Sequence, residues 1–249
     1  MPRFAARLAY DGTQYWGFQR QADAAPTIQA AVELAFSKVA QQPITCVAAG
    51  RTDSGVHASG QVIAWTMDWT HSELALMRAL NSHLPPDIAI QAIQTVDADF
   101  HPRYDAISRT YLYRIYIAPS RDPIRNRFAW HWQQMLDLEA MRSALAMLIG
   151  VHDFATFGQA TQGDSTTRHM FAADIVQVDD EVHITLTASG FLQRMVRSIV
   201  GTLVDVGRGK MSLQAFEAAF RATDRSRSGP SAPPHGLILT NVMYRNLAF

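Results

Sequence analysis

The sequence predicts a mixed α+β fold made of two ferredoxin-like (split βαβ) halves that share a continuous, mostly antiparallel sheet flanked by helices. Three observations indicate this fold. Residues 1–105 carry elements in the order strand, helix, strand, strand, helix, strand. Residues 106–249 carry a looser version of the same alternation. No low-complexity linker separates the two parts, so we expect an N-terminal and a C-terminal subdomain with these bounds, dividing near residues 104–108.

The elements of the first half follow from periodicity and from start and stop signals. Alternation of apolar and polar residues indicates half-buried strands, and an Asp-Gly pair ends the first of them as a turn. A helix opens at Pro26-Thr27, and Ser72 is the expected N-cap of a second helix that a proline pair ends. The expected strands are residues 4–10, 44–47, 62–65 and 88–96.

Between two of these strands lies a loop, residues 48–61, that we expect to present functional groups. Gly50, Gly55 and Gly60 suit a backbone that turns tightly or passes close to a ligand. Between and around them stand one cation, one carboxylate, three hydroxyls and a histidine, with almost no bulk. Such a loop contributes little packing, and Asp53 is its candidate working residue.

The second half is predicted in the same way. A strongly alternating strand at its start carries Tyr111 and Tyr113 on one face. An Asp179-Asp180-Glu181 turn joins two strands as a hairpin, and Ser212 caps a short helix. The expected strands are residues 109–117, 171–178, 182–187 and 237–244, and the expected helices are residues 138–149, 191–206 and 212–220.

Composition is that of a compact globular protein, with 48% hydrophobic and 18% charged residues among 249. The single cysteine, Cys46, excludes an internal disulfide and a thiolate zinc site, and we interpret it as a core residue. No signal peptide or membrane-spanning run is present, so we expect a soluble, cytoplasmic protein. Neither a P-loop nor a dinucleotide fingerprint occurs, and we expect no cofactor and no metal.

The net charge of +0 taken alone argues against a nucleic-acid partner, but the arginines are clustered. Guanidinium binds phosphate as a planar fork and stacks on bases, so these clusters suggest RNA, with solubilising surface charge as the alternative. The clustered basic residues are Arg103, Arg109, Arg114, Arg121, Arg125 and Arg127, then Arg194, Arg197, Arg208 and Lys210, then Arg221, Arg225 and Arg227.

The residues alone leave each candidate open. Asp53 has no second carboxylate in its loop, so it is either an ionised nucleophile or stabiliser near Arg51, or an Asx residue that stabilises the turn. The tyrosine pair Tyr111 and Tyr113 is either part of a site or a pair of packed aromatics. Arg197 lies on a helix and is either directed at a site or solvated.

Residues 50–58, Gly-Arg-Thr-Asp-Ser-Gly-Val-His-Ala, resemble the catalytic motif of the tRNA pseudouridine synthase A (TruA) family. The resemblance is collinear over nearly the whole chain, and it includes residues 10–21, 100–103, 109–113, 191–201 and 233–239. Two departures concern the C-terminal wall of the expected cleft: Ile238 stands where family members often have Tyr, and residues 230–234 are unusually rich in proline.

The resemblance implies a pseudouridine synthase fold with a central RNA-binding cleft and a homodimeric enzyme. The implied reaction is isomerisation of uridine to pseudouridine at positions 38, 39 and 40 of the tRNA anticodon arm, on a flipped-out base. By the same resemblance, Asp53 is the nucleophile and attacks either C6 of the ring or C1′ of the ribose. Tyr111 contacts the target base, Arg197 pairs with Asp53, and Arg51 fills the gap that the base leaves.

Two functions of other classes compete with this one. A non-catalytic ferredoxin-like RNA-binding module would explain the fold, the arginines and the aromatics, but not a carboxylate on a glycine-framed loop, because a carboxylate repels phosphate. A small-molecule carboxylate enzyme is disfavoured, since no second acid or cofactor motif accompanies Asp53.

Overall fold

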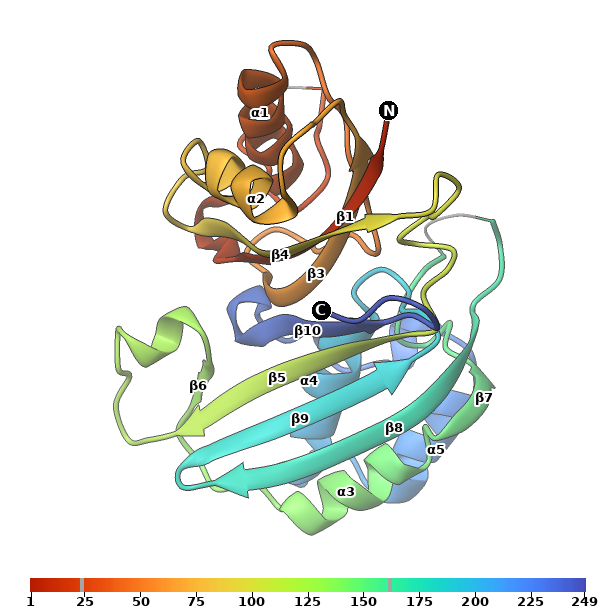
Figure 1. The fold of residues 1–249 in the computed structure, drawn as a ribbon. Helices are drawn as coiled ribbons and strands as arrows, with labels where there is room; N and C mark the ends of the chain where they lie inside the picture. Colours follow the sequence, from red (N-terminus) through yellow and green to blue (C-terminus); the bar gives the residue numbers. More distant parts are fainter. Residues whose placement is uncertain (23–24, 161–162) are drawn as a thin grey trace. The chain divides into compact units, whose positions relative to one another are not determined.

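The computed structural model describes residues 1–22, 25–160 and 163–249, which fold as two compact units (Figure 1). Unit 1 consists of Met1–Ile107 together with Ile238–Phe249, and unit 2 consists of Ser108–Leu237. Both units combine helices with a sheet whose neighbouring strands are mostly antiparallel. The predicted α+β fold class is therefore confirmed.

The sheet of unit 1 has the strand order β4-β1-β3-β10. Strand β1 lies between two antiparallel neighbours, with Arg3 opposite Thr66 of β3 and opposite Val96 of β4. The short strand β2 pairs in antiparallel with β3, placing Val47 opposite Ala64. The bounds are β1 (Arg3–Tyr10), β2 (Val47–Ala48), β3 (His57–Thr66), β4 (Ile88–Val96) and β10 (Leu237–Met243).

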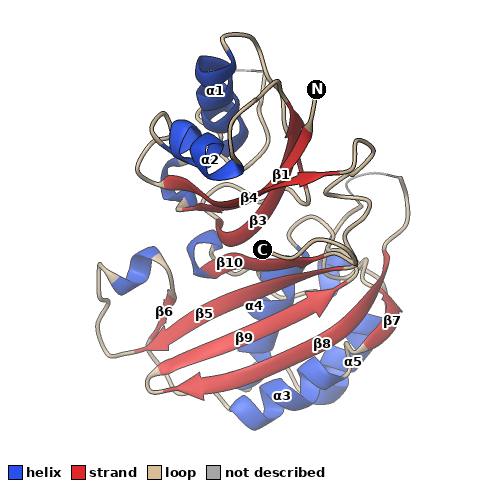
Figure 2. Ribbon diagram, in the orientation of Figure 1, coloured by secondary structure: helices blue, strands red, loops and turns tan. Residues whose placement is uncertain are grey.

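The two helices of unit 1, α1 (Ile28–Ala40) and α2 (Glu73–Asn81), lie on the same face of its sheet (Figure 2). Each begins at the cap that the sequence predicts: the hydroxyl of Thr27 accepts from the Ala30 N–H, and that of Ser72 accepts from the Ala75 N–H. The rings of Phe36 and Trp65, 4.4 Å apart, join α1 to β3. The split βαβ order of the first half is thus present.

Strand β3 begins earlier than predicted, at His57, so the loop between β2 and β3 is only residues 49–56. Although the segment before Val62 is glycine-rich and polar, it is buried, with His57 3% and Gln61 0% exposed. Gly60 allows the close approach of β10, because an added Cβ would lie 2.0 Å from the Thr240 carbonyl oxygen. Close strand packing, rather than ligand approach, accounts for this glycine.

The C-terminal segment belongs to unit 1, whereas we expected residues 106–249 to form one subdomain. Strand β10 pairs in parallel with β3, placing Ile238 opposite His57. After β10, the Tyr244 hydroxyl donates to the Pro102 carbonyl oxygen at 2.7 Å, and its ring lies 5.2 Å from that of Phe100. The last strand therefore completes the sheet of the first half.

The sheet of unit 2 has the strand order β5-β9-β8-β7, with antiparallel neighbours, and β6 pairs in parallel with β5. The sequence predicts β5 and the β8–β9 hairpin but misses β6 and β7, which are too short to show a periodic pattern. The bounds are β5 (Ser108–Ile117), β6 (Trp130–Trp132), β7 (Gly150–Asp153), β8 (Thr167–Val178) and β9 (Glu181–Ala188).

Three helices, α3 (Leu138–Ala146), α4 (Met195–Gly207) and α5 (Leu213–Arg221), lie on one face of the unit 2 sheet (Figure 2). Helix α4 starts four residues later than the predicted Phe191. The Gln193 N–H donates to the Gln159 carbonyl oxygen at 3.0 Å, and Arg194 adopts a left-handed conformation with φ +61°. Both features exclude the preceding residues from the helix.

Candidate active site

The loop that carries Asp53 is held from below by the residue before it. Thr52 is buried, and its hydroxyl oxygen lies 2.8 Å from the hydroxyl oxygen of Tyr10 in β1. Burial raises the pKa of Tyr10 to about 12, although hydrogen bonds with Thr52 and Gln61 oppose the rise. The Tyr10 hydroxyl therefore stays protonated and hydrogen-bonded at neutral pH, fixing Thr52 against the sheet.

The aromatic loop of residues 15–20 packs directly on this backbone. The Phe18 N–H donates to the Thr52 carbonyl oxygen at 3.0 Å. The Tyr15 carbonyl oxygen accepts from the Gly55 N–H at 3.3 Å and from the Ser54 hydroxyl at 3.2 Å. Gly17 has φ +94°, and an added Cβ would lie 2.8 Å from the Thr52 carbonyl oxygen. This loop is a support for the Asp53 loop, which its sequence alone does not show.

Asp53 lies at the turn of the loop and is half-buried. Its carbonyl oxygen accepts from the Val56 N–H at 3.2 Å, so a main-chain hydrogen bond closes this turn. Arg51, two residues earlier, is exposed, and the Gln61 side chain holds the adjacent Gly50 carbonyl at 2.9 Å.

His57 has a structural position. It is 3% exposed, and its Nδ1 atom lies 3.1 Å from the Gly12 nitrogen and 3.1 Å from Oδ1 of Asp11. These contacts tie the start of β3 to the turn after β1. Among residues 1–22, 25–160 and 163–249, no cluster of three His, Cys, Asp or Glu side chains could hold a metal ion.

Tyr111 belongs to unit 2, on β5, where it lies opposite Leu186 of β9. Its ring is 8% exposed and meets that of Phe191 edge to face, with centroids 5.0 Å apart and planes at 84°. Phe191 lies four residues before the start of α4, so this contact fixes the Tyr111 ring against the segment that leads into that helix.

Arg197 also belongs to unit 2 and is the one residue of α4 that is not buried. Its side chain is held in place: Nε donates to the Ala232 carbonyl oxygen at 2.8 Å, and the Ala232 N–H donates back to the Arg197 carbonyl oxygen at 2.9 Å. Burial raises the pKa of Tyr113, while the positive charge of Arg197 opposes this rise. Arg197 is thus a positioned cation and not a freely solvated one.

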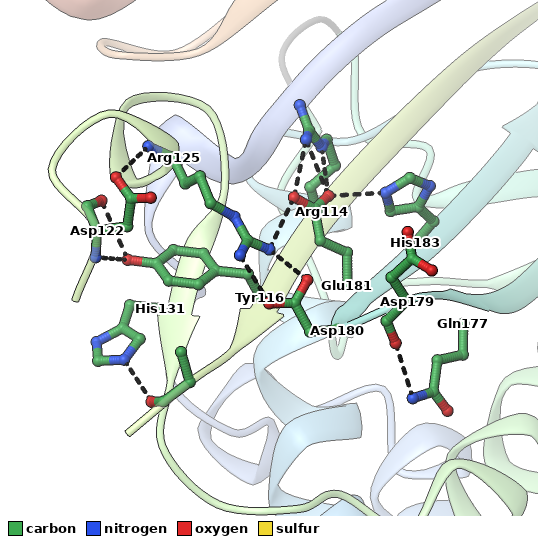
Figure 3. Close-up of polar contacts among 11 residues, drawn as sticks. Arg114, Tyr116, Asp122, Arg125, His131, Gln177, Asp179, Asp180, Glu181 and His183 are labelled. Atoms are coloured by element: carbon green, nitrogen blue, oxygen red, sulfur yellow. Dashed lines mark hydrogen bonds and ion pairs between the residues drawn. The ribbon is translucent and has the colours of Figure 1, made fainter. Parts of the chain in front are cut away.

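Two arginines of the basic stretch 103–127 are neutralised by the β8–β9 hairpin (Figure 3). The Arg114 Nε donates to Oε2 of Glu181 at 2.9 Å. Arg125 pairs with Asp180 at 2.7 Å and with Glu181 at 3.1 Å, and the His183 Nε2 lies 2.9 Å from Glu181. The sequence suggested an RNA-facing role for this whole stretch, but these two side chains anchor the turn of a hairpin.

The structure thus places Asp53 and Arg51 on one loop of unit 1, and Tyr111 and Arg197 at β5 and α4 of unit 2. Sequence reasoning missed the supporting residues, above all Tyr10, Thr52 and Gly17. The glycine at position 17 was the available signal, since its place in an aromatic loop is explained only by a positive φ or a close backbone contact.

Comparison with known proteins identifies the class. A family model described as tRNA pseudouridine synthase matches residues 6–105 and 144–245. A tRNA pseudouridine synthase A of Neisseria meningitidis serogroup B is 40% identical over 244 residues, covering 97% of this chain and 92% of the relative. One of Roseobacter denitrificans is 42% identical over 250 residues, covering 98% and 96%. The chain therefore belongs to the tRNA pseudouridine synthase family, which confirms the resemblance predicted from the motifs.

A more distant similarity appears among solved structures. One match is to a chain in the crystal structure of an archaeal box H/ACA sRNP Nop10–Cbf5 complex, with 11% sequence identity and a TM-score of 0.36. The match covers 81% of the present chain and 54% of the chain in that complex. Within the residues that the structure describes, no helix is long and apolar enough to cross a membrane.

Proposed function

We propose that this protein isomerises uridine to pseudouridine at positions 38, 39 and 40 in the anticodon stem and loop of tRNA, with Asp53 as the nucleophile. The observation that carries the proposal is the Asp53 loop. It is fixed by Thr52 and by the aromatic loop, it closes its turn through the main chain, and it belongs to a chain of the tRNA pseudouridine synthase family.

The chemistry asks little of the protein beyond one positioned carboxylate. The target uridine leaves the RNA stack so that its glycosidic bond becomes accessible. The Asp53 carboxylate attacks C6 of the ring or C1′ of the ribose, and the bond between N1 and C1′ breaks. The freed uracil turns, a bond forms between C5 and C1′, and the bond between the substrate and Asp53 breaks. The proton lost from C5 is balanced by a proton gained at N1. Atoms balance without an oxidant, a reductant or a leaving group that departs.

The other predicted residues have roles that suit their positions. Tyr111, held edge to face by Phe191, would present a fixed ring to the flipped base. Arg197, fixed by Ala232, would pair with the Asp53 carboxylate and orient it, because a guanidinium offers a planar fork of donors. Arg51, exposed on the same loop as Asp53, would occupy the space that the base vacates.

The test is substitution of the nucleophile. Asp53→Asn and Asp53→Ala are expected to abolish pseudouridine formation in an anticodon stem-loop transcript with uridines at the three positions, while RNA binding persists. Asp99→Asn is the matched control, since it makes the same chemical change at an exposed carboxylate of unit 1. Substantial turnover by Asp53→Asn would refute the assignment, and absence of turnover in the wild type would favour the non-catalytic RNA-binding module.

We also propose a cytoplasmic homodimer. A neutral chain gains an extended positive surface when arginine-bearing faces of two copies adjoin. Sedimentation of the purified protein should give the mass of two chains, and a monomer that still modifies tRNA would contradict this account.

A further inference from the structure

A polar depression of about 300 Å³ lies on unit 2, partly open to solvent, and it is lined by Gln159, Gln193, Arg194 and Arg225. Its two glutamines belong to segments that touch through the main chain, since the Gln193 N–H donates to the Gln159 carbonyl oxygen at 3.0 Å. The lining offers hydrogen-bond donors and positive charge but no apolar wall.

Arg225 reaches the depression across hydroxyl groups. Its Nη2 donates to Oγ of Ser198 at 2.8 Å and of Ser231 at 3.3 Å, and its Nη1 donates to Ser228 and to the Thr156 carbonyl oxygen. All these acceptors are neutral oxygens. Burial lowers the pKa of Arg225, and the positive charge of Arg194 lowers it further. The two guanidinium groups are therefore close enough to repel each other.

Arg194 is held in an unusual conformation. It is the N-cap residue of α4 with φ +61°, a region that arginine rarely adopts, and its side chain makes no capping hydrogen bond. Within the described parts of the chain, no carboxylate is paired with Arg194 or with Arg225. Two cations thus face one depression with no anion of the protein to balance them, at a position of backbone strain.

We propose that Arg194, Arg225, Gln159 and Gln193 form a subsite for one phosphodiester group of the RNA backbone. The subsite rests on the proposed function, which supplies the RNA. Arg194 can donate to phosphate oxygens in a forked arrangement, and the glutamine amides add further N–H donors. Both Nη atoms of Arg225 already donate to protein oxygens, so Arg225 contributes its positive charge rather than a second fork. A base would need a stacking surface, which this polar lining does not offer.

The subsite is joined to Arg197 through one segment. The Ser231 hydroxyl accepts from Arg225, and the next residue, Ala232, accepts from Nε of Arg197. Along α4, Arg194 precedes Arg197 by three residues, which is about 4.5 Å along the helix axis. A phosphate held here therefore anchors the RNA strand within about one helical turn of the arginine proposed to serve the nucleophile.

The first measurement is the salt dependence of binding to the anticodon stem-loop transcript. For each phosphate contact, log K for binding falls by about 0.7–0.9 per unit increase in log salt. Relative to 1 M salt, one contact therefore raises the affinity for RNA about five- to eightfold at 0.1 M salt. Arg194→Gln should show that loss and a correspondingly smaller slope. Lys38→Gln, which removes one exposed positive charge on α1, should show neither.

The second measurement finds the phosphate. Each linkage of the stem-loop is replaced in turn by an uncharged methylphosphonate. At one linkage, replacement should weaken wild-type binding about five- to eightfold and leave binding by Arg194→Gln unchanged. Arg194→Gly should lose RNA affinity to the same extent with no decrease in Tm, because glycine adopts the φ of this position without strain. A lower Tm in this variant would instead indicate a structural role and overturn the proposal.

Each remaining outcome is also decisive. If methylphosphonate replacement and Arg194→Gln have additive effects on binding at every linkage, the subsite is overturned. If inorganic phosphate binds in a way that depends on Arg194 but no linkage is coupled to Arg194, the depression is a site for a free anion and the subsite is likewise overturned. Pseudouridine mapping of the same reactions tests the proposed function separately. Turnover without a coupled linkage refutes the subsite alone, whereas a coupled linkage without turnover supports the subsite and refutes the catalytic proposal.

Discussion

Substituting Gly17 by alanine should disturb the Asp53 loop from outside it. Gly17 has φ +94°, and a Cβ at this residue would lie 2.8 Å from the Thr52 carbonyl oxygen and 3.3 Å from the Asp53 carbonyl carbon. The nearest atoms are main-chain atoms, so no flexible side chain can move aside. Relief requires that the backbone of residues 52–53 moves or that the aromatic loop separates from it.

The size of the effect follows from two terms. An L-residue in a left-handed conformation costs about 1–2 kcal/mol, and the close contact adds to this, so we expect a loss of about 2 kcal/mol or more in folding stability. At about 2–4 °C per kcal/mol for a chain of this size, Tm should fall by about 4–8 °C. Because misplacement of a catalytic group by about 1 Å can cost about 100-fold, kcat for pseudouridine formation should fall at least about tenfold.

Gly50→Ala is the matched control for stability. It lies at the start of the Asp53 loop, and an added Cβ would meet no heavy atom within 4 Å. Its Tm should equal that of the wild type or rise slightly, because alanine restricts the unfolded chain. Differential scanning fluorimetry and single-turnover kinetics give both quantities. A Gly17→Ala protein with wild-type Tm and wild-type kcat would refute the support that we assign to the aromatic loop.

Two further predictions concern the supports of each unit. Thr52→Val should cost about 1–2 kcal/mol in urea unfolding, because the buried Tyr10 hydroxyl loses a hydrogen-bond partner; an unchanged midpoint would contradict this. In unit 2, burial alone would raise the pKa of Glu181, but hydrogen bonds from His183, Arg114 and Arg125 lower it below 4.5. Because the pKa of Glu181 is lowered in the folded state, its ionised carboxylate stabilises the fold above pH 4.5. This stabilisation is lost as pH falls through the folded-state pKa. The Tm difference between wild type and Glu181→Gln should therefore be constant at neutral pH and shrink below pH 4.5; a difference that grows there would contradict the sign.

The elements that local signals define could be predicted, and those that depend on distant partners could not. Thr27 and Ser72 cap their helices as expected, because a cap depends on three or four consecutive residues. The place of β10 in unit 1 depends instead on a parallel pairing with His57 and Ala58, far earlier in the chain. Alternation identifies a strand, but it carries no information about which edge that strand joins.

The same distinction applies to the candidate site. The glycine-framed Asp53 loop could be recognised from its own residues, but the hydrogen bonds that hold it come from Tyr10, Tyr15 and Phe18. The position of Arg197 was undecided between a solvated face and a site. The hydrogen bond from its Nε to the Ala232 carbonyl oxygen, together with the burial of every other residue of α4, shows that its side chain is placed rather than solvated. Burial on all sides of a helix is a property of its tertiary surroundings.

The distribution of partners around the arginines reconciles a neutral chain with an RNA substrate. A net charge of +0 describes the sum over the chain, whereas RNA meets individual side chains. In unit 2, the carboxylates of Asp180 and Glu181 neutralise Arg114 and Arg125 at the hairpin turn (Figure 3). Arg225 has only neutral oxygens as acceptors. Because exposed charges beyond about 10 Å are screened at 0.1 M salt, the hairpin acids do not cancel a cation placed elsewhere on the unit. Local segregation of paired from unpaired arginines can thus create a phosphate-binding surface within a single neutral chain, whether or not a second copy extends it.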